Sequence, residues 1–218
     1  MTIKVIGFAA STCAQVVLIT LNELGVPYEF EEIAYEDIKK PDYLAKHPFG
    51  QVPVLIDGDF QLFESRPMSI YLAKKYQGTK TSTILYPTDD LRKAALVDQF
   101  ISIEYSNYDE AIKKIAVEEI YTKFNGKTPV QENIIAGREA LSKVLDVYEK
   151  LLEGKDYLAG DFSLADIFHI PYTYIFYQRN HRDLWDDPKR PNVARWWKNL
   201  SGRESWKKIL RKYEGKFL

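Results

Sequence analysis

The sequence has little of what makes disulfides and metal sites. Its 218 residues include one cysteine, Cys13, and three histidines. A single cysteine cannot close an internal disulfide, and no cysteines or histidines are paired at the spacing of a zinc site. We therefore expect no metal and no prosthetic group, in a protein that works in the reducing cytoplasm.

Charge of one sign and long apolar runs are also missing. There are 30 Lys and Arg residues and 31 Asp and Glu residues, which gives a net charge of −1. Nucleic-acid-binding proteins usually carry a clear positive excess, so we expect no nucleic-acid partner. No apolar run reaches the ~18 residues of a membrane-spanning helix, so we expect no membrane association.

The first 77 residues carry strand and helix signals in alternation. Residues 13–24 repeat apolar side chains at helical spacing, and Asp57-Gly58 is a strong hairpin signal between two apolar runs. Ser65 is suited to cap the helix that follows the hairpin. We predict one small mixed sheet with helices on its faces. Its strands are predicted at residues 3–8, 28–33, 52–57 and 60–63, with a short helix before the hairpin.

The rest of the chain is predicted to be helical. Residues 78–90 are small, polar and Pro-containing, which is typical of a linker. Two domains result, an α/β domain over residues 1–77 and an all-α domain over residues 91–218. Helices of the second domain are predicted at residues 89–114, 130–152, 163–177, 193–200 and 204–213.

One helix start is unusually well specified. Ser163 and Asp166 have the spacing of a capping box, and Phe162 and Ile167 have that of a hydrophobic staple. Helix nucleation is enough to explain these residues, so we assign Asp166 no catalytic role.

The first junction of strand and helix, "FAASTCAQ", is a candidate chemical site. Ser11 or Thr12 stands where backbone N–H groups lack helical partners and the helix dipole is positive. Such a place stabilises an anion and can pull a thiol of pKa ~8.5 below neutrality. The alternative is that Ser11 only caps the helix.

A second candidate site lies in "HPFGQVPVLIDGDFQLFESRPM", residues 47–68. Pro53 keeps Val52 extended, and a cis bond between them would present the backbone groups of Val52 to an extended peptide. Glu64 and Ser65 stand at another helix start, where a carboxylate and an ammonium can both be bound. With two further cations, Lys39 and Lys40, these groups suit a short zwitterionic peptide whose thiol lies near Ser11, namely glutathione.

Together these motifs resemble a family. The stretch "HPFGQVPVLIDGDFQLFESRPMSIYLAKKY", with "AASTCAQVV" before it and "ALSKVLDVYEKLL…YLAGDFSLADIFHIP" after it, is similar to phi-type glutathione transferases over nearly the whole chain. The resemblance implies a thioredoxin-like first domain that binds glutathione and a helical second domain that supplies most of the electrophile pocket. It also implies a cytosolic homodimer, with Phe49 inserted in the partner and Arg66 paired with Asp90 or Asp98.

The resemblance also implies roles for individual residues. Ser11 would donate a hydrogen bond to the glutathione thiolate, and Lys39 would hold the glycine carboxylate. Lys40 would compensate for Ile38, which stands where the family often has His. The cysteinyl part would be held by Gln51, Val52 and cis Pro53, the γ-glutamyl end by Glu64 and Ser65, and the electrophile by Ala10, Thr12, Tyr35, Tyr121 and Phe124.

The expected activity is conjugation of the glutathione thiolate, as co-substrate, to hydrophobic electrophiles in detoxification, with glutathione-dependent peroxidase activity beside it. The alternatives are a non-catalytic carrier of hydrophobic ligands and a transferase-like assembly module. A thiol transferase acting through Cys13 is a further alternative, although helical periodicity points Cys13 inward. Further aromatic candidates for the electrophile pocket are Tyr105, Tyr108, Tyr174 and Phe176.

Overall fold

The structure is a computed structural model that describes residues 2–215. The chain folds into two compact units. The first comprises residues 2–89 together with residues 203–215, and the second comprises residues 90–202.

The first unit is built on a mixed sheet of four strands in the order β2-β1-β3-β4. Strand β1 (Ile3–Gly7) pairs in parallel with β2 (Tyr28–Glu32) and antiparallel with β3 (Val54–Asp57). Strand β4 (Phe60–Phe63) closes the hairpin with β3. The mixed sheet predicted from the sequence is therefore confirmed.

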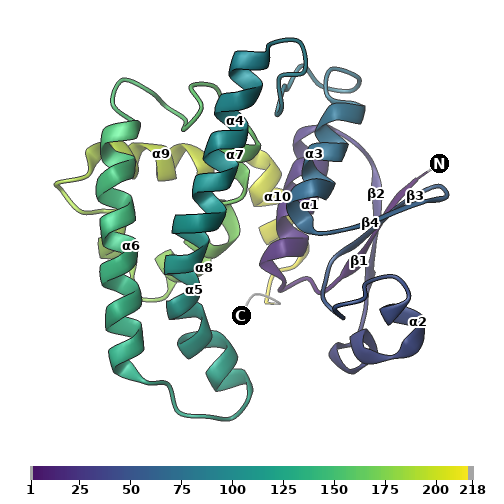
Figure 1. The fold of residues 1–218 in the computed structure, drawn as a ribbon, viewed down its shortest axis with the longest axis horizontal. Helices are drawn as coiled ribbons and strands as arrows, with labels where there is room; N and C mark the ends of the chain where they lie inside the picture. The colour runs from purple at the N-terminus through teal and green to yellow at the C-terminus, as the bar shows by residue number, and fades with distance from the viewer. Residues whose placement is uncertain (1, 216–218) are drawn as a thin grey trace. The chain divides into compact units, whose positions relative to one another are not determined.

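Successive residues of a strand point to opposite faces of the sheet. In β1 and β3 apolar residues point to both faces, so helices cover both. Ile6 and Val54 pack with Ile38 and Tyr43, which come from the turn η1 and the helix α2. Their neighbours along the strands, such as Val5, are fully buried on the other face. There α1 and α3 pack against each other, as Figure 1 shows. These elements are η1 (Tyr35–Lys39), α2 (Pro41–Leu44), α1 (Thr12–Glu23) and α3 (Ser65–Tyr76).

The last helix, α10 (Glu204–Lys212), belongs to the first unit. The sequence predicts residues 203–218 in the helical domain, but the described part of this segment packs on α1. Arg203 makes two hydrogen bonds to the Glu23 carboxylate, at 2.6 and 2.8 Å, and Ser205 donates a third at 2.5 Å. Trp206 is fully buried beside them. A carboxylate at the end of α1 thus anchors a segment far along the chain.

The second unit begins with a longer helical run than expected. We predicted a helix over residues 89–114, whereas the run continues to Thr122 and contains two π-helical turns. Ser106 and Asn107 in the first of these turns donate to carbonyls four residues back, a pattern that competes with the regular ladder. The parts are α4 (Leu91–Ile103), η2 (Glu104–Tyr108), α5 (Asp109–Ala116) and η3 (Val117–Thr122), followed by α6 (Gln131–Leu151).

The helix predicted over residues 163–177 is in fact two, α7 (Leu164–Ile167) and α8 (Ile170–Gln178). Pro171 explains the break, because it lacks an N–H and its ring clashes with the carbonyl four residues earlier. The capping box of Ser163 and Asp166 is confirmed. The remaining elements are η4 (Arg182–Leu184) and α9 (Pro191–Ser201). Across the described residues, every helix falls short of the length and apolar character needed to cross a bilayer.

Candidate functional site

One row of paired residues brings the predicted site segments to the same edge of the sheet. Ile6 pairs with Val54, and Val54 pairs with Phe63. Strand β1 ends one residue after Ile6, β3 begins at Val54, and β4 ends at Phe63. Strand β2 runs parallel to β1 and ends beside it, at the same edge. The connections that leave this edge carry Ser11, Lys39, Gln51, Val52, Pro53, Glu64 and Ser65.

Ser11 is the N-cap of α1. Its Oγ accepts a hydrogen bond from the Ala14 amide at 3.2 Å, and its own amide donates to the Phe8 carbonyl at 3.0 Å. The sequence left open whether Ser11 or Thr12 holds this position, and the structure gives it to Ser11. The cap uses a lone pair of the oxygen, so the hydroxyl hydrogen remains available for a thiolate. Capping and catalysis are therefore compatible.

Cys13 lies in the first turn of α1 and is only half-buried. Cys13 is less buried than helical periodicity predicts. Val16, Val17 and Leu21 are buried, whereas Cys13 is not. The residues of α1 that precede Ala14 are all half-buried, and full burial begins at Ala14.

Pro53 lies close to the start of α1. A Cβ placed on Gly7 would stand 3.3 Å from Cβ of Ala14 and 3.7 Å from Cβ of Pro53. Gly7 thus lets β1, α1 and the Pro53 loop approach one another. The Val52–Pro53 peptide bond is cis, as the resemblance implies.

The loop before Pro53 is held through three consecutive carbonyls. The Lys39 ammonium donates to the carbonyls of Phe49 and Gly50, at 3.3 and 3.0 Å, and the Tyr43 hydroxyl donates to that of Gln51 at 2.7 Å. Burial raises the pKa of Tyr43 to about 12, so this hydroxyl keeps its proton. Tyr43 was missed in the sequence, because its partner is a backbone carbonyl and no sequence pattern indicates that contact.

Lys40 and Ile38 take different positions from Lys39. Lys40 forms an ion pair with Asp37, and the hydrogen bond from this pair raises the pKa of Lys40. Ile38 is buried in the core under the sheet, where it packs with Ile6 and Tyr43. The residue that stands in place of the family's His is therefore a core residue.

Glu64 occupies the cap position of α3, in a strained conformation. Its φ is +75° and its ψ is 112°, and its side chain makes no capping hydrogen bond. We had expected Ser65 as the cap, but Ser65 is the first helical residue and is buried. A non-glycine residue with positive φ costs about 1–3 kcal/mol and is found most often at functional sites. Strain and position both mark Glu64 as a candidate ligand residue.

The residues implied for the electrophile pocket lie on both units. Ala10 and Thr12 are half-buried at the start of α1, and Tyr35 is exposed on η1. Tyr121 and Phe124 are exposed in and just after η3, and the Tyr121 hydroxyl lies 3.2 Å from that of Tyr172. Of the other aromatic candidates, Tyr105 is exposed, whereas Tyr108 and Phe176 belong to the core.

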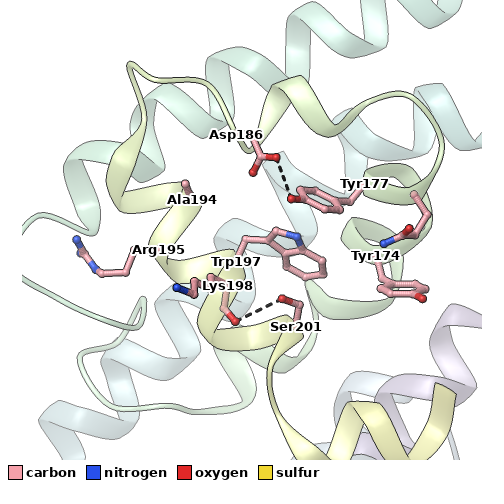
Figure 2. A pocket seen from close by; sticks show the side chains of 9 residues that line it. Tyr174, Tyr177, Asp186, Ala194, Arg195, Trp197, Lys198 and Ser201 are labelled. Carbon is pink, nitrogen blue, oxygen red and sulfur yellow. Dashed lines mark hydrogen bonds between the residues drawn. The ribbon is translucent and has the colours of Figure 1, made fainter. Parts of the chain in front are cut away.

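A cavity of about 530 Å³ opens in the second unit (Figure 2). The Tyr177 hydroxyl donates to Asp186 at 2.8 Å on one side, and Ser201 donates to the Lys198 carbonyl at 3.3 Å on the other. Tyr174 is the one sequence candidate that lines it. The lining residues are Tyr174, Tyr177, Gln178, Asp186, Ala194, Arg195, Trp197, Lys198 and Ser201.

Comparisons with known proteins agree with the two-unit fold described above. Sequence models of the glutathione S-transferase N-terminal and C-terminal domains match residues 5–80 and 101–204. The chain is 39% identical to a probable glutathione S-transferase, GSTF1, of Oryza sativa subsp. japonica, over 95% of this chain and 94% of that protein.

Solved structures are similar as well. Glutathione transferase F7 from Populus trichocarpa has a TM-score of 0.91 and 36% identity, with 96% of this chain and 98% of that one covered. Glutathione S-transferase I from maize, in complex with an atrazine glutathione conjugate, has a TM-score of 0.89 and 34% identity, with 99% of both chains covered.

Proposed function

Because the chain belongs to the glutathione S-transferase family, with phi-type relatives, we propose that the sheet edge bearing Ser11, Gln51 and Glu64 is its glutathione site. The protein is a transferase that conjugates glutathione to electrophiles. The observation that carries the proposed site is the row Ile6, Val54, Phe63, which places the three segments at one edge.

Ser11 is the proposed catalytic residue. An unperturbed thiol is only a few per cent ionised at pH 7. The Ser11 hydroxyl and the N-terminus of the 12-residue helix α1 favour the charged thiolate, because both present hydrogen-bond donors and positive potential. The thiolate then attacks an electrophilic carbon, the new C–S bond forms, and the leaving group departs with its electron pair. Attack on a peroxide oxygen would give peroxidase activity from the same thiolate.

The rest of glutathione is assigned to the loops at the same edge. Glu64 accepts the γ-glutamyl ammonium, while Ser65 and the start of α3 hold the γ-glutamyl carboxylate. Gln51, Val52 and Pro53 hold the cysteinyl part. Lys39 reaches the glycine carboxylate through the third N–H of its ammonium, because the other two are used on Phe49 and Gly50. Lys40 adds positive charge beside it, reduced by its pairing with Asp37.

The electrophile pocket and the dimer interface are assigned to exposed side chains. We propose that Ala10, Thr12, Tyr35, Tyr121 and Phe124 contact hydrophobic electrophiles, since all five are at least partly exposed. A homodimer is supported by Phe49, which is 69% exposed, and by α4, where Leu91 is 87% exposed. A cytoplasmic location is proposed from the single cysteine. Arg66 is proposed to pair with Asp90, which caps α4 through the amides of Arg92 and Lys93, or with Asp98, across a two-fold axis.

The experiment that tests the proposed function has two steps. The protein is first passed over immobilised glutathione, and the eluted protein is then given free glutathione and a generic aryl halide. Retention followed by turnover is the expected result. Retention without turnover would favour the carrier of hydrophobic ligands, and absence of retention would remove the proposed glutathione site.

A further inference from the structure

His47 is a buried histidine between the two loops that the proposed function assigns to glutathione. His47 is only 2% exposed. The ring lies 4.8 Å from the ring of Phe63, at an interplanar angle of 36°, and 6.3 Å edge-on from that of Phe49. Phe63 directly precedes Glu64, and Phe49 precedes Gln51 by two residues. The imidazole therefore joins the β4–α3 junction to the loop before Pro53.

The backbone of His47 shapes the same loop. Its amide donates to the Tyr43 carbonyl at 2.9 Å, and its carbonyl accepts from the Gly50 amide at 2.8 Å. Gly50 has φ of +56°, and a Cβ there would stand 2.8 Å from the Lys39 ammonium, so the turn has little room to change. A displacement of the His47 ring would be passed to Gln51 through this turn.

The imidazole is poorly placed to carry a proton. Nδ1 is fully buried and has no hydrogen-bond partner among the residues that the structure describes. Burial has the largest effect and lowers the pKa of His47. The negative charge of Glu64 and a hydrogen bond with the backbone of His47 raise it, and the positive charge of Lys39 lowers it further. Of the two charged neighbours, Glu64 has the larger effect. The neutral ring is thus the form that fits the site.

We propose that His47 is a positioning residue of the glutathione site, which binds glutathione best when its imidazole is neutral and seated between Phe63 and Phe49. This inference rests on the proposed function. When the ammonium of glutathione pairs with Glu64, the carboxylate no longer favours a proton on His47, so binding expels the proton from those molecules that carry one at low pH. A charged ring also needs water and leaves its aromatic seat, and it disturbs the turn that presents Gln51. By linkage, affinity falls as pH falls.

The test uses S-methylglutathione, which has no thiol to titrate. Its amino and carboxyl groups keep their charges between about pH 5 and pH 7. Calorimetry on the full chain should show affinity severalfold weaker at pH 5 than at pH 7, because the pKa of His47 is lower in the complex than in the free protein. Binding at pH 6 should release protons into the buffer.

Two variants make the result specific. His47→Phe keeps an aromatic ring against Phe63 but cannot titrate, so its affinity should be the same at both pH values. His181→Gln, in the second unit, should keep the pH dependence of the wild type. A wild-type affinity that does not change with pH, or a pH dependence that persists in His47→Phe, overturns the proposal for His47. Absence of binding at any pH in the millimolar range would instead overturn the glutathione site itself.

If His47→Phe does not fold, proton release at pH 6 is compared between the wild type and His47→Gln, which cannot titrate and should release none. The heat of binding is compared in two buffers of different ionisation enthalpy. A difference that corresponds to released protons supports the proposal, and equal heats contradict it.

Discussion

The Oγ of Ser11 accepts a hydrogen bond from the Ala14 amide, at 3.2 Å. This contact caps α1 and fixes the orientation of the hydroxyl with respect to the helix axis. The oxygen acts as an acceptor toward the helix, so its hydrogen is left to donate to an anion that binds at the helix start. Substitution can separate the cap from the proposed contact with the thiolate.

Ser11→Ala should lower turnover with an aryl halide by about 10- to 1000-fold, as expected for the loss of one oriented donor. It should also lower the free energy of unfolding by about 1 kcal/mol, because the cap is lost. Ser11→Gly is the matched control, since glycine caps cost only a few tenths of a kcal/mol while the hydroxyl is still missing. Steady-state kinetics and denaturant unfolding measure the two effects. Turnover that survives in both variants would move the catalytic role to Thr12.

Tyr43→Phe should raise the KM for glutathione by about two- to tenfold and leave kcat nearly unchanged. The variant removes the hydrogen bond of 2.7 Å to the Gln51 carbonyl, and one such bond contributes about 0.5–1.5 kcal/mol. Tyr177→Phe, which removes the bond to Asp186 in the second unit, is the control. Equal KM values for wild type and Tyr43→Phe would show that the loop is held without this hydroxyl.

Glu23→Gln should destabilise the protein by about 1–3 kcal/mol. The substitution weakens a bidentate pair in which Glu23 is 7% and Arg203 24% exposed, and the partial exposure of Arg203 keeps the cost below that of a fully buried pair. Lys4→Ala, which removes exposed pairs with Glu29 and Glu31, should have little effect. Chemical denaturation measures both. A Glu23→Gln variant as stable as Lys4→Ala would show that the charge of Glu23 does not contribute to the docking of α10.

Asp166 should make part of the stability depend on pH. Burial raises its pKa to about 6, although hydrogen bonds from Trp196, Leu158 and Ser163 act in the opposite direction. Between about pH 4 and pH 6 the folded state then binds more protons than the unfolded state. The unfolding free energy of the wild type, relative to Asp166→Asn, should therefore fall as pH rises through this range. A difference that stays constant would place the folded pKa near the unfolded value.

Sedimentation should give twice the mass of one chain, which is 25.3 kDa. Phe49→Ala should shift the protein toward the monomer, because it removes a large apolar side chain that is 69% exposed. Phe60→Ala is the control, because it removes an exposed aromatic side chain that is not assigned to the dimer interface. A wild-type protein that sediments with the mass of one chain at micromolar concentration would contradict the proposed dimer.

Local chemistry made much of the fold readable from the sequence. The Asp57-Gly58 hairpin, the Ser11 cap and the capping box of Ser163 and Asp166 each depend on a few neighbouring residues, and each is present in the structure. What could not be read depends on distant contacts. No local pattern indicates that Glu23 and Arg203 meet across 180 positions of the chain.

The candidate site follows the same division. The two helix starts could be predicted, because hydroxyl and acidic residues mark them. The hydrogen bonds of Lys39 and Tyr43 to the loop carbonyls could not, because backbone acceptors leave no trace in a sequence. Cys13 and Ser65 were misplaced for a simpler reason, since periodicity and capping rules locate a helix boundary only to within a residue or two.

We propose that Ser11 and the start of α1 keep bound glutathione ionised at neutral pH. Ultraviolet difference absorption of the thiolate, followed against pH in the binary complex, measures this directly. The wild type should show a bound thiol with its pKa about one to two units below the ~8.5 of an ordinary cysteine, and Ser11→Ala should return it toward that value. A bound thiol that titrates near 8.5 in the wild type would contradict the account.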